Sequence, residues 1–478
     1  MIFFTFEFLA FFTFVLALNW MLKPWPLLWR LFLLAASYYF YSVWDLRLLA
    51  ILVGLSFLNY WVGRGIYSST GRARDLITGT GIILNLSVLG FFKYYDFFRS
   101  SAETVLGKLG FVVNLPLFEV IMAVGFSFYS FKMISFLIDC RRGKMEEYPS
   151  LLDLSLYVAF FSQLLSGPIA RAREFLPQLK NGGAKKIEDM YLYVTLIAAS
   201  LFKKLLVVNY LTVNITDDVF MVPQNHGSLV ILLAILAYAL VIYFDFSSYS
   251  DMAIGFAGLL GFKSPINFDS PYSSLSIKDF WRRWHITLSD WVRDYIYIPL
   301  GGNRKGKIRQ YFNLILAMTL MGFWHGAAAH YVFWGFLQGL ALTFVAVFSA
   351  IKNSISAKIG MVTGCLARVG TFFSWLATFV FVCFSWIFFR AGSVQDGFAM
   401  IDQLFSFKRL DETFKLYVLF AIIVGFIFLI FEKRLIRIFS SFQERLPLAV
   451  WFVIVAVAVT LLFRAGSDTL PSFIYFSF

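Results

Sequence analysis

His325 is the side chain in this sequence whose type and setting best suit acid–base chemistry. It lies in the run Gly-Phe-Trp-His-Gly at residues 322–326, within an apolar segment of a chain that has only four histidines. A group that titrates near neutral pH is costly to bury and is therefore a functional candidate. A dry imidazole would be mostly neutral and could accept a proton from a hydroxyl that attacks an acyl carbon. A packing histidine bonded to a backbone carbonyl is the alternative.

His285 is the second candidate, and it ends the run Trp-Arg-Arg-Trp-His at residues 281–285. On a continuous helix it would share one face with Trp281 and Ser289, which lie four residues away on either side. The alternative is an interfacial belt of tryptophan and arginine. Such a belt explains the tryptophans and arginines well but explains the histidine poorly. Two histidines without a third ligand at a defined spacing do not predict a metal site, and we expect none.

Two carboxylates close to the end of an apolar segment also need partners. Asp245 and Asp251 flank the run Phe-Ser-Ser-Tyr-Ser. We expect structural ion pairs, and a role in orienting a histidine is the less favoured alternative. The arginines that we expect as partners are Arg282, Arg283 and Arg293. The remaining histidines, His226 and His330, are expected to be incidental.

The composition places these residues in a membrane protein. The chain of 478 residues is 60% hydrophobic, 20% aromatic and only 14% charged, with a mean hydropathy of +0.75. The apolar segments are long and continuous, which favours an all-α polytopic bundle over a barrel. The net charge of +13 comes mainly from short connecting segments, as is typical of residues that set membrane orientation. Nucleic-acid binding is therefore not expected.

The apolar segments predict roughly ten to twelve transmembrane helices, together with re-entrant and interfacial helices. The basic connections place the N-terminus outside, and the segment 151–166 breaks the alternation of sides unless it re-enters the membrane. A polar, aromatic stretch at 262–310 predicts amphipathic helices in the interface or buried inside the bundle. Leu300–Arg304 is predicted to form a tight turn. No internal repeat is evident, and a single domain over residues 1–478 is expected. The candidate spans are 3–22, 27–44, 46–62, 78–92, 116–138, 151–166, 190–208, 228–246, 312–322, 329–350, 371–389, 415–431 and 447–463.

Several motifs in order along the chain resemble the membrane-bound O-acyltransferases. The central ones are Tyr-Phe-Asp-Phe-Ser-Ser-Tyr-Ser-Asp at 243–251, Asp-Phe-Trp-Arg-Arg-Trp-His at 279–285 and Gly-Phe-Trp-His-Gly at 322–326. Within the family, the chain is similar to the bacterial branch that acetylates exported polysaccharides. Two departures from the expected pattern, Ser248 and Ser477, touch neither candidate histidine. Further similar stretches lie at 37–41, 125–129, 167–169, 295–304, 386–391 and 473–478.

The resemblance implies an acyltransferase of the bacterial inner membrane. His325 matches the family's essential histidine and would act as general base or relay, and His285 matches its second signature position. The implied donor is acetyl-CoA from the cytoplasm, with no tightly bound cofactor. The implied acceptor route leads through an extracytoplasmic partner acetyltransferase, of the serine-hydrolase-like type, to an alginate-like polysaccharide. From charge alone, Arg282, Arg283 and Arg304 are candidates to attract the phosphates of the donor.

Three alternatives remain open from the residues. D-alanyl transfer to teichoic acid uses similar motifs, although the stretches at 299–304 and 386–391 are more similar to the acetylation branch. A transporter or channel would also need polytopic helices and buried charges, but it should show repeated halves. A scaffold that only recruits the true enzyme would tolerate replacement of both histidines.

Overall fold

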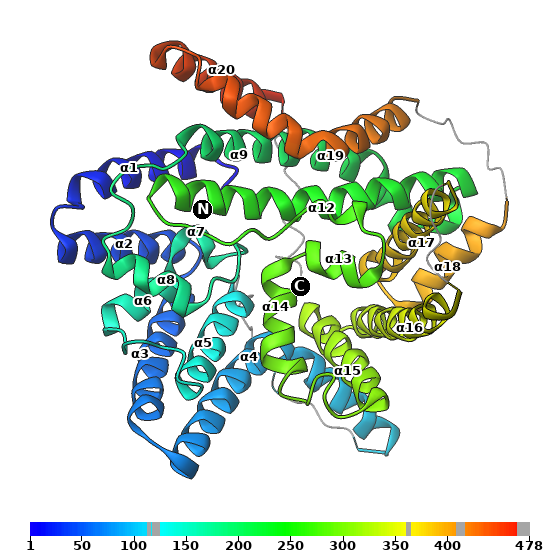
Figure 1. Cartoon of the computed structure of the whole chain (residues 1–478), viewed down its shortest axis with the longest axis horizontal. Helices are drawn as coiled ribbons and strands as arrows, with labels where there is room; N and C mark the ends of the chain where they lie inside the picture. Colours follow the sequence, from blue (N-terminus) through cyan, green and yellow to red (C-terminus); the bar gives the residue numbers. More distant parts are fainter. Residues whose placement is uncertain (112–115, 117–124, 360–364, 408–415, 466–478) are drawn as a thin grey trace. The chain divides into compact units, whose positions relative to one another are not determined.

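The computed structural model describes residues 1–111, 116, 125–359, 365–407 and 416–465 (Figure 1). Over these residues the chain is helical and contains no strand, so the predicted all-α class is confirmed. The motif at 473–478 and part of the expected span 116–138 lie outside the described residues. The chain forms two compact units, one of residues 1–197 and 249–265 and the other of residues 198–248 and 266–478. The expectation of one domain stays a prediction.

The first unit contains mainly the N-terminal helices. Its interior is fixed by polar groups as well as apolar ones, because the Nδ2 of buried Asn19 donates to the carbonyl oxygen of Leu260 and its Oδ1 accepts from the indole of Trp29. The helices are α1 (Phe6–Leu22), α2 (Pro26–Ser42), α3 (Leu46–Ser68), α4 (Gly71–Lys108), α5 (Phe126–Arg141), α6 (Leu151–Ala159), α7 (Phe161–Leu164) and α8 (Ala172–Lys180).

The second unit carries both candidate histidines. Helices α9 (Met190–Phe202) and α12 (Ser228–Leu259) each have residues in both units. Three of the described stretches are π-helical: η1 (Lys203–Val208), η2 (Thr212–Thr216) and η5 (Arg293–Tyr297). The other helices are α10 (Asn209–Leu211), α11 (Asp217–Met221), η3 (Pro223–Asn225), η4 (Pro271–Ser273), α13 (Ile277–Arg283), α14 (Ile286–Val292), α15 (Lys307–His325), α16 (Ala329–Ile359), α17 (Cys365–Arg390), α18 (Val394–Phe405), α19 (Leu416–Gln443) and α20 (Leu448–Ala465).

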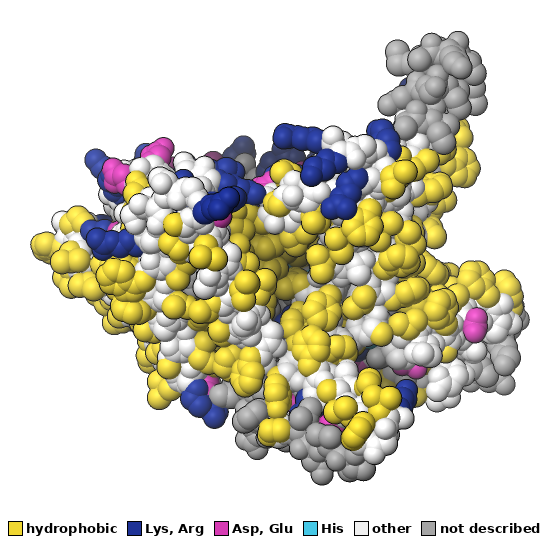
Figure 2. Space-filling model, turned by 90° about the horizontal axis from the view of Figure 1, so that it is seen from below, with side chains coloured by type: hydrophobic (Ala, Val, Ile, Leu, Met, Phe, Trp, Pro, Cys, Tyr) yellow, Lys and Arg dark blue, Asp and Glu magenta, His cyan; other side chains and the backbone are white. Residues whose placement is uncertain are grey.

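Seven helices in the described part of the chain are long and apolar enough to cross a membrane. They confirm a polytopic membrane protein, although they are fewer than the ten to twelve crossings expected. Several expected spans form shorter helices instead, such as Phe6–Leu22 with 17 residues. On the face shown in Figure 2, apolar side chains cover much of the surface. The seven are Leu46–Ser68, Gly71–Lys108, Met190–Met221, Ser228–Leu259, Ala329–Ser349, Arg368–Arg390 and Leu416–Gln443.

The segment 151–166 is a broken helix, as the sequence suggests. It forms α6 and α7, which are interrupted at Phe160, where ψ is 109°. All residues from Leu154 to Ala170 are buried, so this irregular backbone is enclosed by protein, as the membrane requires. Its re-entry into the membrane stays a prediction.

The polar segment 262–310 forms short helices, as expected. Several aromatic side chains of this segment are buried, among them Trp281, Trp284 and Trp291. The stretch 300–304 is the predicted turn, with Gly301 and Gly302 at φ angles of 106° and 54°. The side-chain amide of Asn313 on α15 donates to the carbonyl oxygens of Leu300 and Gly302, and so fixes this turn.

Helices α15 and α16 form a closely packed hairpin, and His325 lies where α15 ends and the connection to α16 begins (Figure 1). The approach depends on glycines, which let two helix backbones touch. A Cβ on Gly322 would lie 2.3 Å from the carbonyl oxygen of Tyr331, and a Cβ on Gly335 would lie 2.4 Å from that of Met318. Because backbone atoms cannot move aside cheaply, these positions set the place of His325.

The substitution Gly335→Ala should therefore destabilise the protein. The added methyl group meets backbone atoms of α15, and overpacking of this kind costs about 1–3 kcal/mol. The matched control is Gly370→Ala on α17, where a Cβ meets nothing within 4 Å. This substitution should stabilise the protein by about 0.5–1 kcal/mol, because alanine favours the helix over glycine. Thermal melting of the detergent-purified protein checks both. A Gly335→Ala protein that melts at or above the wild-type temperature would contradict this packing account.

Candidate active site

His285 lies at a break between two short helices. It follows α13, precedes α14, and adopts φ 41° and ψ 55°, in the left-handed region. This conformation costs a non-glycine residue about 1–2 kcal/mol, so surrounding contacts must hold it in place. The side chain is buried, with 1% of its surface exposed.

The break corrects the expectation that Trp281, His285 and Ser289 share one helical face. The chain leaves the helix at Trp284, where φ is −101° and ψ is 127°, so no continuous helix runs through these residues. Trp281 instead donates from its indole to Gln338 Oε1 on α16, at 3.2 Å. The sequence pattern could not show the break, because it contains neither glycine nor proline.

Asn267 fixes the imidazole of His285. The two are joined by a 3.0 Å hydrogen bond between His285 Nδ1 and Asn267 Oδ1. The same oxygen accepts from the backbone N–H of Thr287 at 3.3 Å and from its hydroxyl at 2.9 Å. The backbone N–H of Ile286 donates to the carbonyl oxygen of Asn267 at 2.9 Å. One asparagine thus holds both the ring and the unusual backbone around it.

These contacts determine which ring nitrogen of His285 carries the proton. A backbone N–H can only donate, so the Asn267 atom that receives the N–H of Thr287 is the amide oxygen rather than the nitrogen. An amide oxygen can only accept, and His285 Nδ1 must therefore be the protonated nitrogen. In the neutral ring, Nε2 then keeps its lone pair and can accept a proton.

Burial keeps this ring neutral. Desolvation lowers the pKa of His285 to about 3, because a charged imidazolium is disfavoured away from water. The edge-on contact with Phe246 of α12, with ring centres 4.5 Å apart and planes at 86°, contributes to this enclosure. At neutral pH, His285 therefore offers a fixed, uncharged hydrogen-bond acceptor and no positive charge.

His325 ends α15 and is held by aromatic rings. It is buried, with 3% of its surface exposed. Its ring lies edge-on to Trp334 of α16 at 5.3 Å and to Phe389 of α17 at 5.2 Å between ring centres, and it also contacts Trp324 at 4.8 Å. Three helices therefore confine the imidazole.

One aromatic cluster borders both histidines. Trp386 of α17 stacks on Trp334 beside His325, with centres 5.7 Å apart and planes at 16°. It also contacts Trp284 at 5.0 Å, and Trp284 in turn contacts Phe268 at 5.1 Å. Phe268 packs at 5.1 Å against Phe246, which contacts His285. The structure thus brings the two predicted histidines to one side-chain cluster within one compact unit.

The three predicted arginines differ in their surroundings. Arg282 and Arg304 are exposed, whereas Arg283 is partly buried and pairs with Asp279 at 3.1 Å. Attraction of donor phosphates by these three residues stays a prediction.

The ion pair of Asp245 is confirmed, but its expected arginine partner is wrong. Asp245 Oδ1 lies 2.7 Å from Nζ of Lys204, and both side chains are 2% exposed. Two adjacent lysines inside an apolar span were the signal for this pair in the sequence, since such residues need buried partners. Asp251 belongs to the other compact unit.

The other two histidines have structural surroundings. His330 Nδ1 forms a 3.0 Å hydrogen bond with the carbonyl oxygen of Phe388. A histidine bonded to a backbone carbonyl in this way has a packing role. His226 lies 3.6 Å from the carboxylate of Asp218. His330 also contacts the ring of Tyr331, with centres 4.0 Å apart, and Tyr331 contacts Phe389 at 5.4 Å.

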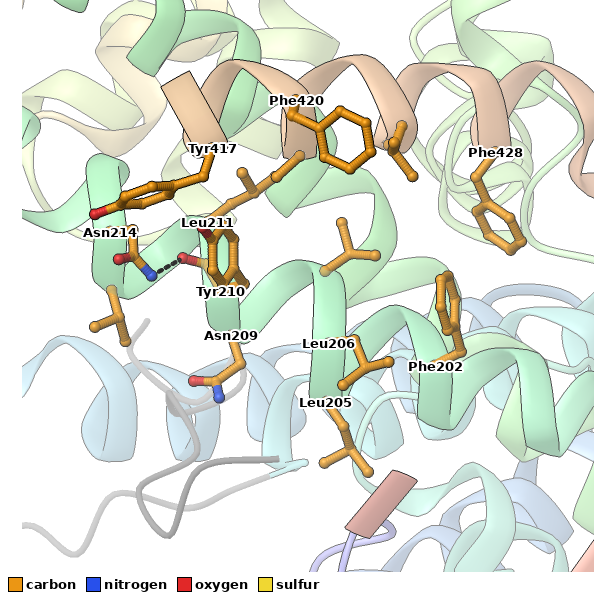
Figure 3. Close-up of a pocket in the computed structure, with 15 residues that line it drawn as sticks. Phe202, Leu205, Leu206, Asn209, Tyr210, Leu211, Asn214, Tyr417, Phe420 and Phe428 are labelled. Atoms are coloured by element: carbon orange, nitrogen blue, oxygen red, sulfur yellow. Dashed lines mark hydrogen bonds between the residues drawn. The ribbon is translucent and has the colours of Figure 1, made fainter. Parts of the chain in front are cut away.

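A cavity of about 570 Å³ lies elsewhere in the second unit (Figure 3). Its walls come from the stretch 202–214 and from α19, and its lining is largely apolar, with Phe202, Leu206, Phe420 and Phe428 among the residues shown. Neither candidate histidine lines it. The two candidate histidines therefore lie outside this cavity.

Comparisons with known proteins agree with the motifs. The family model described as the membrane-bound O-acyltransferase family matches residues 77–389. A probable alginate O-acetylase AlgI of Pseudomonas aeruginosa is 37% identical over 382 residues, covering 79% of this chain and 70% of that protein. A peptidoglycan O-acetyltransferase of Helicobacter pylori is 34% identical over 79% of this chain and 74% of its own length. A teichoic acid D-alanyltransferase of Bacillus subtilis is 29% identical over 57% of this chain and 70% of its own length.

The substitution Asn267→Asp should move the pH dependence of activity. An aspartate keeps an acceptor for His285 and Thr287 but adds a negative charge, which favours the imidazolium and raises the pKa of His285. The neutral ring, and with it the hydrogen-bond acceptor at Nε2, is then lost as pH falls through this raised pKa, so activity at pH 6 should fall relative to pH 8. Rates of acyl transfer between pH 5 and 9 measure the shift. The exposed residue Asn303 supplies the control Asn303→Asp, and equal pH profiles for Asn267→Asp and wild type would rule out this role for Asn267.

Proposed function

This chain belongs to the membrane-bound O-acyltransferase family, and from that premise we propose that it supplies acetyl groups for the O-acetylation of an exported polysaccharide. The chain is an O-acyltransferase of a multi-pass membrane type. The single observation that supports acyl transfer at this site is that His285 and His325 are both buried and border one aromatic cluster. The choice of acetyl over D-alanyl is supported by the higher identity and coverage of the relatives named as O-acetylating proteins.

His325 is proposed as the general base or relay of the transfer. The acceptor oxygen attacks the carbonyl carbon of an acetyl thioester, the carbon–sulfur bond breaks, and the sulfur leaves as a thiolate. His325 takes the proton of the attacking hydroxyl and returns it to the leaving sulfur. The surrounding rings of Trp334 and Phe389 exclude water, which limits loss of the acetyl group to hydrolysis.

His285 is proposed as a positioning or electrostatic group. Its fixed Nε2 lone pair suits acceptance of a hydrogen bond from the hydroxyl or from a donor group near the reacting atoms. The thioester donor in this proposal is acetyl-CoA on the cytoplasmic side of the bacterial inner membrane. Exposed Arg282 and Arg304 are candidate contacts for its phosphates.

The first acceptor is proposed to be a hydroxyl of an extracytoplasmic acetyltransferase of the serine-hydrolase-like type, which then modifies the polymer. A glycan acceptor agrees with the relatives named for alginate and for peptidoglycan. Transfer of D-alanine to teichoic acid is the second candidate, favoured only by the more distant relative.

The substitution His325→Ala tests this function. Loss of the general base should lower O-acetylation of the exported polymer by about 10²–10⁴-fold in cells that express the variant at the wild-type level. The loop residue His226 supplies the control, and His226→Ala should leave acetylation unchanged. The mass of the ester substituent distinguishes acetyl from D-alanyl. Wild-type acetylation in the His325→Ala strain would refute the assignment.

A further inference from the structure

Two adjacent lysines are buried inside a membrane-spanning segment. Lys203 and Lys204 begin the π-helical stretch η1, within the span Met190–Met221, and their exposed fractions are 0% and 1%. Buried ammonium groups in a membrane need charged partners, and they mark functional positions more often than structural ones. A π-helical turn holds more residues than an α-helical turn, so the angle about the helix axis between consecutive side chains is smaller. Both lysines can therefore face the same neighbouring helices.

Each lysine is paired with a carboxylate. Lys204 Nζ lies 2.7 Å from Asp245 Oδ1 on α12. Lys203 Nζ lies 2.8 Å from Glu432 Oε1 on α19 and donates to the hydroxyl of Ser247 at 3.1 Å. The other oxygen of Glu432 accepts from the hydroxyl of Tyr243 at 2.7 Å. We call these six residues the buried charge network: Lys203, Lys204, Tyr243, Asp245, Ser247 and Glu432.

The network holds one short stretch of α12 at three positions. Tyr243, Asp245 and Ser247 are each anchored, and Phe246 lies between the last two. Phe246 is the residue whose ring contacts the edge of the His285 imidazole, with centres 4.5 Å apart. The ring of Tyr243 also reaches the aromatic cluster, at 6.3 Å from Trp284. The anchored stretch is therefore the part of α12 that faces the candidate active site.

The apolar cavity offers no alternative role for the lysines. Leu205 and Leu206, the next two residues of η1, line that cavity beside Phe202, while neither lysine does (Figure 3). Nor does stability of the fold explain the pairs, since well-packed apolar residues at a buried site often stabilise a protein as much as an ion pair does, or more. What ion pairs add is direction, because each bond fixes one atom against one partner.

We propose that Lys203 and Lys204 are positioning residues that, through Glu432 and Asp245, hold Phe246 of α12 against the imidazole of His285. The inference rests on the proposed function in so far as His285 belongs to the active site. Phe246, through which the network reaches His285, carries no charge, so the network acts on His285 through position and enclosure.

The test measures acetyl transfer by the wild-type protein and its variants, each purified in detergent, with acetyl-CoA as donor. The recipient is the partner acetyltransferase or a small-molecule hydroxyl acceptor. Lys204→Met alone leaves the buried Asp245 without its lysine and can fail to fold. The informative variant is therefore the apolar double substitution Lys204→Met with Asp245→Leu, which removes both charges. The swap Lys204→Asp with Asp245→Lys restores a pair. Lys180→Met is the control, because it breaks an ion pair with Glu147 in which both side chains are exposed.

A positioning role predicts that the double variant keeps its melting temperature but loses kcat by about tenfold to a hundredfold, with KM for the donor almost unchanged. Once the anchor at Asp245, next to Phe246, is lost, water reaches His285, its pKa rises toward the ordinary value, and activity is lost at a higher pH than in wild type. The charge swap should recover part of kcat, and Lys180→Met should match wild type.

A folded double variant with the kcat and pH profile of wild type would overturn the inference. His325→Ala, assayed beside it, separates this result from failure of the proposed function. If His325→Ala is inactive while the double variant is fully active, only the role of the network is lost. If His325→Ala also retains wild-type activity, the proposed function is wrong and the inference falls with it.

Discussion

The hydrogen bonds that converge on Asn267 are the constraint on which the rest of this site depends. One amide oxygen accepts from the ring of His285 and twice from Thr287, and the backbone oxygen of Asn267 accepts from Ile286. Together they hold a histidine in a left-handed conformation that it would otherwise leave. The same bonds assign the proton to Nδ1, and burial then keeps the ring neutral. The geometry and the tautomer of His285 thus have one origin in Asn267, and its neutral state comes from burial.

His325 is held by a different means. Its ring is confined by Trp324, Trp334 and Phe389, and its height along the hairpin is set by glycines that bring α15 and α16 into backbone contact. A rigid apolar enclosure suits a base that must receive a proton without competition from water. One histidine is therefore fixed by hydrogen bonds and the other by packing, and a shared aromatic cluster borders both.

Much of this account could be predicted from the sequence. Apolar run lengths predicted a polytopic helical membrane protein, although they predicted more crossings than the seven helices of the described residues. The cost of a buried histidine singled out His325, and the motifs paired it with His285. The break at Trp284 was missed because no glycine or proline marks it, and with it the left-handed backbone of His285. Asn267 was missed because a single asparagine in a polar segment carries no signal until its neighbours in space are known. Lys204 and Glu432 illustrate the same limit, since their partners lie 41 and more than 200 residues away in sequence.

The protonation state of His285 is the most direct test of the central claim. Because the chain has four histidines, nitrogen NMR of protein labelled in its imidazole rings should show few signals, and His285→Gln identifies the one in question. The account predicts a neutral ring with the proton on Nδ1, unchanged from pH 8 to pH 5. A proton on Nε2, or conversion to the imidazolium near pH 6.5, would contradict it.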